Sequence, residues 1–233
     1  GGVEGTDSII NADDDVRYTM TITADNVEIQ DFIFTDQNEV KTSPIGALIS
    51  VQAENVVITS NQFYATESYG IHIDETASGS VVNGNTINNT KFGIVVESSD
   101  TNDIFNNEIY QCEDSGISLE NTAENRLYDN TIYDCSKAIL ASYCSGLNIT
   151  NNEFYNTDYA GMLLQSCQEV TVKENTIYDN TGSGLYLASD YCVIKENDFE
   201  SNQRGITLSG NNNDITKNQF ITCVGSGIFA LGT

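Results

Sequence analysis

The chain has 233 residues, of which 34 are acidic and 9 are basic, giving a formal net charge of −25. A surface of this charge repels nucleic acid and anionic membranes, so we expect neither as a partner, whereas cations are attracted. The sequence contains no apolar run of roughly 18 residues or more, so we expect no membrane span. An apolar content of 39% with regular spacing favours a folded chain over disorder.

A column of Asn, once Asp, recurs at nearly constant spacing. Its members are Asp31, Asn61, Asn85, Asn107, Asn130, Asn152, Asn175, Asn197 and Asn218. After the first gap the spacing is about 22 residues, and such periods are typical of stacked-repeat architectures. Asn tolerates the left-handed backbone of tight turns, and its amide can hydrogen-bond to an identical side chain one repeat away. We therefore expect this column to be structural.

One repeat, residues 116–138, shows the predicted elements in chain order. Residues 116–120 alternate apolar and polar side chains, as in a strand with one buried face. Residues 121–125 form a polar turn, residues 126–133 carry the next buried positions, and residues 134–137 turn again. None of these segments has the period of a helix. The repeat predicts a solenoid with three short strands per coil, each paired in parallel with its counterpart one coil away.

The tandem pattern Gly-Ile-x-Leu-x, a turn, and Ile-x-x-Asn-x-Ile resembles the right-handed parallel β-helix repeat. This repeat occurs in pectin-lyase-like proteins, in carbohydrate-binding and sugar-hydrolase repeats, and in the periplasmic protein associated with nitrous oxide reductase maturation. The resemblance covers about residues 19–231 and implies an all-β, right-handed, single-stranded parallel β-helix of about nine coils of ~22 residues. We assign residues 1–18 to an N-terminal lead-in segment and residues 19–233 to the β-helix domain.

Three acidic side chains are predicted to stack on consecutive coils, in the strand that begins at each repeating Gly. Asp74, Glu97 and Glu120 share one outward position there, beside His72, the single histidine. Carboxylates about 5 Å apart repel one another unless a cation bridges them or one is protonated. Oxygen ligands suit Ca²⁺, so these three residues are candidate metal ligands. The alternative is a solvated acidic stripe on an acidic protein.

The same patch is the candidate catalytic site. Asp74, Glu97, Glu120 and His72 could perform general acid/base chemistry, with Lys91 at the border. By resemblance, lyases and epimerases on this fold pair Ca²⁺ or a neutralising group with a basic side chain or Tyr. The paired-Asp and Gly-His-Gly signatures of polygalacturonase relatives do not occur in the sequence, and neither does the Asp-Pro-His signature of mannuronan epimerases. This counts against catalysis without excluding it.

An apolar row continues the same face toward the C-terminus. Leu140, Leu163 and Tyr186 point outward on consecutive coils, which makes them candidate substrate-binding residues. Such a row can be a sugar-stacking platform, a partner interface or a surface covered by a loop.

Four of the six cysteines are predicted to stack in pairs on adjacent coils, Cys112 with Cys135 and Cys144 with Cys167. Stacked Cα atoms near 5 Å lie within disulfide range, so two disulfides are expected, which would place the protein outside the cytosol. The alternative is two stacks of unlinked thiols. Cys192 is expected to face the core. No Cys/His spacing supports zinc, and one His with two Met residues argues against copper, so no cofactor besides Ca²⁺ is expected.

Together these features favour an extracellular, cell-surface or periplasmic β-helix module that binds a polysaccharide or cell-surface glycan, or that has a structural role. One alternative is a polysaccharide lyase, epimerase or hydrolase acting at the acidic patch. Another is a stacking subunit of a surface assembly. Because exposed strand edges invite pairing, other domains or subunits are expected at the helix ends.

Overall fold

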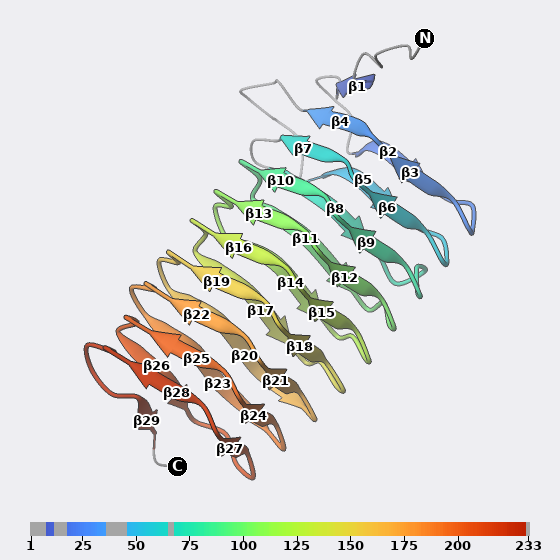
Figure 1. Cartoon of the computed structure of the whole chain (residues 1–233). Coiled ribbons are helices and arrows are strands. Elements are labelled where there is room, and N and C mark those ends of the chain that lie inside the picture. The colour runs from blue at the N-terminus through green and yellow to red at the C-terminus, as the bar shows by residue number, and fades with distance from the viewer. Residues whose placement is uncertain (1–7, 12–17, 36–45, 65–67, 232–233) are drawn as a thin grey trace.

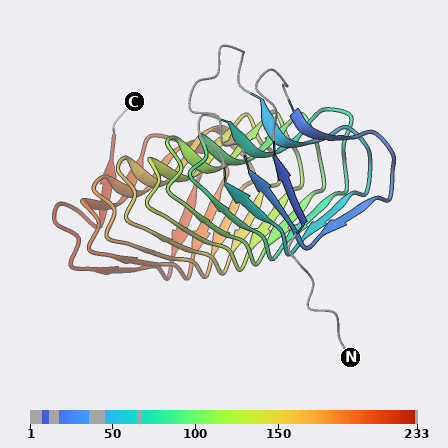
Figure 2. The same cartoon turned by 90° about the horizontal axis from the view of Figure 1, so that it is seen from above.

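The computed structural model describes residues 8–11, 18–35, 46–64 and 68–231. Its strands pair in parallel and form three sheets along an elongated solenoid, as Figure 1 shows. Successive coils lie side by side along the axis (Figure 2). The fold class predicted from the sequence is therefore confirmed. No helix in the described part of the chain is long and apolar enough to cross a membrane.

Each coil contributes one strand to each sheet. Among the described residues, sheet A has ten strands: β1 (Ser8–Asn11), β4 (Phe32–Thr35), β7 (Gln62–Tyr64), β10 (Thr86–Asn88), β13 (Glu108–Tyr110), β16 (Thr131–Tyr133), β19 (Glu153–Tyr155), β22 (Thr176–Tyr178), β25 (Asp198–Glu200) and β28 (Gln219–Ile221). Sheet B has β2 (Tyr18–Ile22), β5 (Ala47–Val51), β8 (Tyr69–Ile73), β11 (Phe92–Glu97), β14 (Ser115–Glu120), β17 (Lys137–Ser142), β20 (Ala160–Gln168), β23 (Ser183–Asp190), β26 (Arg204–Leu208) and β29 (Ile228–Ala230). Sheet C has β3 (Glu28–Gln30), β6 (Val57–Thr59), β9 (Val81–Asn83), β12 (Asp103–Phe105), β15 (Arg126–Tyr128), β18 (Asn148–Thr150), β21 (Thr171–Lys173), β24 (Val193–Lys195) and β27 (Asp214–Thr216).

The core is a set of apolar rows that run along the solenoid. In sheet B, Ile71, Ile94, Ile117 and Ile139 pair in register from strand to strand, and each is fully buried. β-Branched side chains suit this position because they pack well on a pleated surface. Burying each such side chain contributes about 1.5–3 kcal/mol, so the repeated rows stabilise an otherwise narrow core.

The Asn column forms the predicted hydrogen-bonded ladder inside the corner between sheets C and A. Asn107 is typical: its backbone N–H and its Nδ2 both donate to Asn130 Oδ1, at 3.1 and 3.0 Å. Asn107 Nδ2 also donates to the Val82 carbonyl oxygen at 2.9 Å. The ladder therefore satisfies polar groups that the turn would otherwise bury without partners, as a structural role requires.

Two details of this column differ from the prediction. The left-handed backbone belongs to the residue before each ladder Asn, with φ of 53° at Asn106 and 55° at Asp129, so the bend and the hydrogen bonds are supplied by different residues. Asp31 also lies outside the ladder. Its own φ is 61°, and the next residue, Phe32, donates its N–H to Asn61 Oδ1 at 3.0 Å. Asp31 therefore occupies the bend position, one residue earlier than the spacing suggested.

The last described coil leaves apolar side chains accessible to solvent. Its exposed members are Ile221, Val224, Ile228, Phe229 and Leu231. Docking of other domains or subunits at the helix ends stays a prediction.

Candidate functional site

The outer face of sheet B brings together the predicted acidic residues and the histidine. Glu97 of β11 lies opposite Glu120 of β14, and His72 of β8 lies opposite Val95 of β11. His72 Nε2 is 3.1 Å from Glu97 Oε2. The histidine side chain is 13% exposed and the glutamate 48%, so the pair has one sheltered partner and one that meets solvent.

Asp74 lies beside this pair rather than in it. Asp74 and Glu97, with Glu75 and Ser98, line a shallow hollow of about 230 Å³. Asp74 Oδ1 accepts hydrogen bonds from the N–H and Oγ1 of Thr76, at 2.9 and 2.6 Å, which fixes its orientation.

The carboxylates are not arranged as a ligand shell. Within the described ranges, no group of three or more His, Cys, Asp or Glu side chains is placed to hold a metal ion. Ca²⁺ binding by Asp74, Glu97 and Glu120 therefore stays a prediction, as does catalysis by these residues and His72.

Two aromatic residues that the sequence reasoning missed complete the patch. Tyr69 and Phe92 are register partners in β8 and β11, with ring centroids 5.2 Å apart and an interplanar angle of 89°. The Tyr69 ring also meets the His72 ring edge-on at 5.9 Å. Each aromatic directly precedes a repeating Gly, whereas the outward positions considered from the sequence were those after it. In this edge-to-face arrangement the edge of one ring meets the face of the other, and both side chains are half-buried.

Farther along sheet B the apolar row lies as predicted. Leu140 of β17 pairs with Leu163 of β20, which pairs with Tyr186 of β23. All three side chains are half-buried. The outward face thus changes from acidic and aromatic near β8 to apolar near β20, and the assignment of the row to substrate binding stays a prediction.

An ion pair lies at the edge where the chain enters sheet B. Lys137 Nζ is 2.6 Å from Asp114 Oδ1, and the lysine side chain is only 14% exposed. Burial would raise the pKa of the Asp114 carboxyl, but the hydrogen bond from Lys137 and the charges of Lys137 and Lys91 lower it below its ordinary value. Lys91, predicted to border the acidic patch, therefore contributes its charge to this pair.

A tyrosine ladder on the outer face of sheet A was also missed. Tyr110, Tyr133, Tyr155 and Tyr178 stack on consecutive coils with centroids 4.8–5.0 Å apart and interplanar angles of 3–11°. Because the rings cover one another's faces, mainly their edges meet solvent, which suits structure better than sugar stacking. The third position of these strands repeats Tyr every 22 or 23 residues, which was the signal to look for.

The ladder should resist ionisation. Burial, followed by a hydrogen bond to Glu108, raises the pKa of Tyr133, and burial and Glu153 do the same for Tyr178. The neutral phenol is therefore favoured by the fold, so its contribution to stability is present below the ordinary pKa of about 10 and is lost as the pH rises above it. At a pH of about 11 we expect the near-ultraviolet phenolate absorbance of the folded protein to correspond to fewer than its 12 tyrosines. In denaturant at the same pH, all 12 should contribute. Identical folded and unfolded titration curves would contradict this.

The four cysteines lie in the predicted pairs. The backbone N–H groups of Cys112 and Cys144 donate to the Sγ atoms of Cys135 and Cys167, each at 3.4 Å. All four side chains are buried and are thiols in this structure, and the two disulfides stay a prediction. Cys192 is fully buried, as expected.

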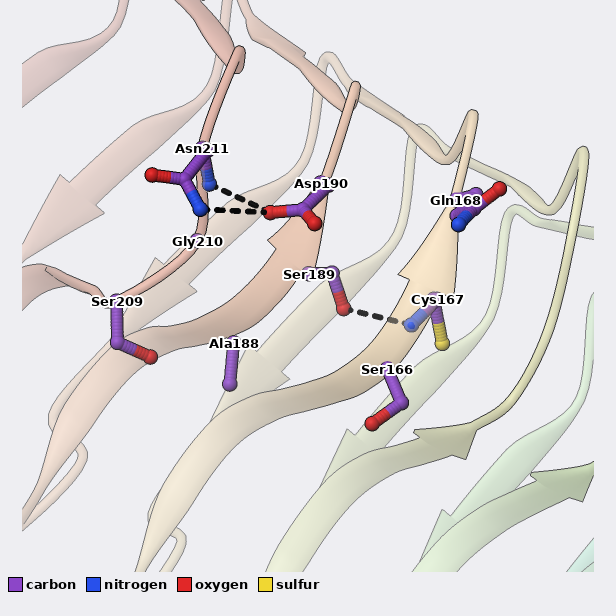
Figure 3. Close-up of a pocket in the computed structure, with 9 residues that line it drawn as sticks. All are labelled: Ser166, Cys167, Gln168, Ala188, Ser189, Asp190, Ser209, Gly210 and Asn211. Carbon is purple, nitrogen blue, oxygen red and sulfur yellow. Dashed lines mark hydrogen bonds between the residues drawn. The ribbon is translucent and has the colours of Figure 1, made fainter. Parts of the chain in front are cut away.

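A second, larger hollow of about 410 Å³ lies where β20 and β23 end. Figure 3 shows its lining, which includes Cys167, Ser189 and Asp190. Cys167 donates its N–H to Ser189 Oγ at 3.0 Å, and Asp190 Oδ1 accepts from the Asn211 N–H at 2.6 Å. The register between β20 and β23 shifts between Gln165 and Gln168.

Two family models match this chain. "Right handed beta helix region" matches residues 115–232, and "Periplasmic copper-binding protein (NosD)" matches residues 4–162. The chain belongs to the NosD family. The predicted resemblance to right-handed β-helix proteins is thereby confirmed. The description of the NosD family also names the periplasm. The sequence matches no curated protein.

Solved structures similar to this NosD chain include proteins named for carbohydrates. DFA-IIIase from Arthrobacter chlorophenolicus A6 in complex with GF2 has a TM-score of 0.69 at 16% identity, over 83% of this chain and 64% of that one. A mutant of the periplasmic alginate epimerase AlgG has a TM-score of 0.63 at 14% identity, and the match covers 90% of this chain and 61% of that one. The complex of XylC with xylose has a TM-score of 0.61 at 15% identity, and the match covers 76% of this chain and 36% of that one. The NosD chain thus spans less than two thirds of each, and the likeness shows the fold alone.

Proposed function

We propose that this chain is a glycan-binding β-helix module of the periplasm or cell exterior, with its binding face on sheet B. The observation that carries the proposal is the cluster of Tyr69, His72, Phe92 and Glu97 on β8 and β11. Sugars present apolar C–H faces and hydroxyl rims, which match ring faces beside a carboxylate acceptor. The name of one similar structure, which contains xylose, supports a carbohydrate ligand.

The face is long enough for an oligosaccharide. From β8 to β23 it spans six neighbouring strands, which corresponds to roughly 24 Å at about 4.8 Å per strand. Acceptors cluster at one end, at Glu97 and Glu120, and apolar contacts at the other, at Leu163 and Tyr186. An extended glycan could therefore meet hydroxyl acceptors first and packing surfaces farther along.

Charge narrows the ligand class. A chain of net charge −25 repels polyuronates, particularly at the stripe formed by Asp74, Glu97 and Glu120. We therefore expect neutral glycans, or glycans bearing amines, to bind in preference to uronate polymers. Ca²⁺ could reverse this order by bridging carboxylates, so binding is best measured with and without millimolar Ca²⁺.

A glycan array of neutral, amine-bearing and uronate oligosaccharides tests the proposal. Glu97→Gln retains the side-chain shape but removes the charge that holds His72, and we expect at least about a tenfold loss of affinity, equivalent to about 1.4 kcal/mol. The matched control is Glu200→Gln, an exposed glutamate of sheet A, which should bind as the wild type does. If the protein binds no glycan on the array, or if both variants lose affinity equally, the proposal is contradicted.

A second candidate function is glycan cleavage at the same face, and the 3.1 Å contact between His72 and Glu97 favours it. A histidine held by a carboxylate is a usual general base, and Glu120 lies one strand away. Glycans that bind are incubated with the protein and assayed for new reducing ends or unsaturated sugars. Product from wild type but not from Glu97→Gln supports cleavage, and no product from any bound glycan excludes it.

The family description names copper, whose two oxidation states prefer different donor atoms. Cu²⁺ prefers nitrogen and oxygen ligands, and the single histidine already contacts Glu97. Cu⁺ prefers thiolates, and the chain has two buried thiol pairs. Donor type alone therefore favours Cu⁺ over Cu²⁺, and within the described residues no three His, Cys, Asp or Glu side chains are placed around one ion. The expectation of no copper site considered His and Met and left these thiols out.

A further inference from the structure

We propose that the larger hollow binds one uncharged sugar unit, so that the glycan-binding face of sheet B continues into a subsite where β20 and β23 end. The inference rests on the proposed function and deepens it. Tyr186, the last member of the apolar row, and Ala188 lie on the same face of β23, because alternate residues of a strand share a face. Ala188 lines the hollow, so a glycan that packs on the row reaches the hollow within about 7 Å.

The hollow lies where one strand carries an extra residue. Gln165 of β20 pairs with Ala188 of β23. The next pair, Gln168 with Asp190, lies three residues on along β20 but two residues on along β23. Ser166 lies in this stretch with a φ of 54°, and it is exposed as Gln165 is, which breaks the alternation of the strand. Irregularities of this kind re-aim side chains and are frequent next to functional sites.

The lining offers uncharged hydrogen-bonding groups and a single carboxylate. Its hydroxyl groups belong to Ser166, Ser189 and Ser209, its amides to Gln168 and Asn211, and its carboxylate to Asp190 (Figure 3). The side chains of Ser166, Gln168 and Ser209 form no hydrogen bond with the described residues. Asp190 accepts the Asn211 bonds through Oδ1, which leaves its Oδ2 atom. Four polar groups at this hollow are therefore available to a ligand.

The chemistry and the size of the lining match one sugar ring. Each hydroxyl group of a sugar both donates and accepts hydrogen bonds, which suits the serine hydroxyls and the two amides. The volume of about 410 Å³ lies in the lower part of the roughly 300–1,000 Å³ range of small-molecule sites. Asp190 and the net charge of −25 disfavour a sugar that carries a carboxylate, and one carboxylate is too few for a Ca²⁺ site.

The three coils that form the hollow are held together by backbone contacts. Ser189 Oγ accepts the N–H of Cys167 on the preceding coil at 3.0 Å. On the following coil, an added Cβ atom at Gly210 would overlap the carbonyl oxygen of Ser189, so the two chains lie in close contact there. The lining is therefore preformed, and a ligand does not bear the cost of ordering it.

Methyl glycosides of neutral hexoses and pentoses test the hollow by itself, since each is one sugar unit. Each is titrated to millimolar concentration while backbone and side-chain amide shifts are followed by NMR. Gln168→Ala/Asp190→Asn changes two lining groups that are register partners on adjacent strands. Gln219→Ala/Asp198→Asn is the matched control, because these two residues are register partners on sheet A with similar exposure. Thermal unfolding verifies that both variants remain folded.

We expect the neutral glycosides to shift amides of residues 166–168, 188–190 and 209–211 in the wild type and in the control. Gln168→Ala/Asp190→Asn should weaken this binding at least about fivefold, as the loss of two hydrogen-bonding groups implies. Glu97→Gln should leave it unchanged, because Glu97 does not line the hollow. No shifts in these residues, equal losses in the two double variants, or tighter binding of methyl glucuronide would overturn the inference.

The inference and the proposed function can fail separately. If Glu97→Gln weakens oligosaccharide binding but Gln168→Ala/Asp190→Asn does not, the binding face on sheet B is retained and the subsite is overturned. If the methyl glycosides bind at the hollow but no oligosaccharide binds along sheet B, the hollow is supported as a sugar site and the proposed function is contradicted.

Discussion

Replacing Asn130 by alanine is expected to lower the free energy of unfolding by about 4 kcal/mol, because several buried polar groups lose their partners at once. Asn130 Oδ1 accepts from the N–H and Nδ2 of Asn107, and its Nδ2 donates to the Ile104 carbonyl oxygen at 2.9 Å and to Asn152 Oδ1 at 3.0 Å. Each buried group left unsatisfied costs about 1–3 kcal/mol, and the lost side chain leaves a gap in addition.

Denaturant unfolding monitored by circular dichroism measures this change. Asn148→Ala is the matched control, since Asn148 is an exposed asparagine in β18 outside the ladder, and it should shift the free energy by less than about 0.5 kcal/mol. Equal effects of the two substitutions would show that the ladder bonds add nothing beyond ordinary surface contacts.

Gly182→Ala is expected to cost about 3 kcal/mol, since a Cβ atom there would overlap the carbonyl oxygen of Tyr159 on the neighbouring coil. The oxygen belongs to the backbone, and the carbonyl carbon of Tyr159 would lie 2.8 Å from the added Cβ atom. The two coils must therefore separate to admit one methyl group. The change tests how closely the coils pack just before β23.

Gly84→Ala provides the contrast for this second variant. Gly84 has a φ of +64°, but the nearest atom to an added Cβ is Ser60 Oγ at 3.9 Å, so only backbone strain of about 1 kcal/mol is expected. Thermal unfolding of both variants separates overlap from strain. A Gly182→Ala protein as stable as Gly84→Ala would show that the coils yield easily at that corner.

The fold could be predicted because one pattern repeats along the chain, so an error in any one coil is corrected by the others. Asp31 shows the limit of this reasoning. Its residue type suits the ladder, but its place depends on which backbone N–H reaches Asn61, and a spacing count does not show a shift of one residue. The sequence analysis likewise assigned the left-handed bend and the ladder hydrogen bonds to one residue, because the two residues that supply them are adjacent in the chain.

The site was predicted less completely. The row of Glu97 and Glu120 followed from the repeat, since register alone fixes it. The contact between His72 and Glu97 depends on side-chain rotamers, and the edge-to-face pair of Tyr69 and Phe92 depends on a position before the Gly that was not considered. The hollow at Cys167 lies where the register of two long strands shifts, a local departure that an averaged repeat conceals.

The central claim is that a glycan binds along the outer face of sheet B, and backbone chemical-shift mapping by NMR tests it most directly. With an oligosaccharide selected by the array, the account predicts shifts concentrated in β8, β11 and β14, extending toward β20, with sheets A and C largely unchanged. Loss of those shifts in Glu97→Gln, but not in Glu200→Gln, would complete the expected result. Shifts centred on the tyrosine ladder of sheet A, or no shifts at all, would contradict the account.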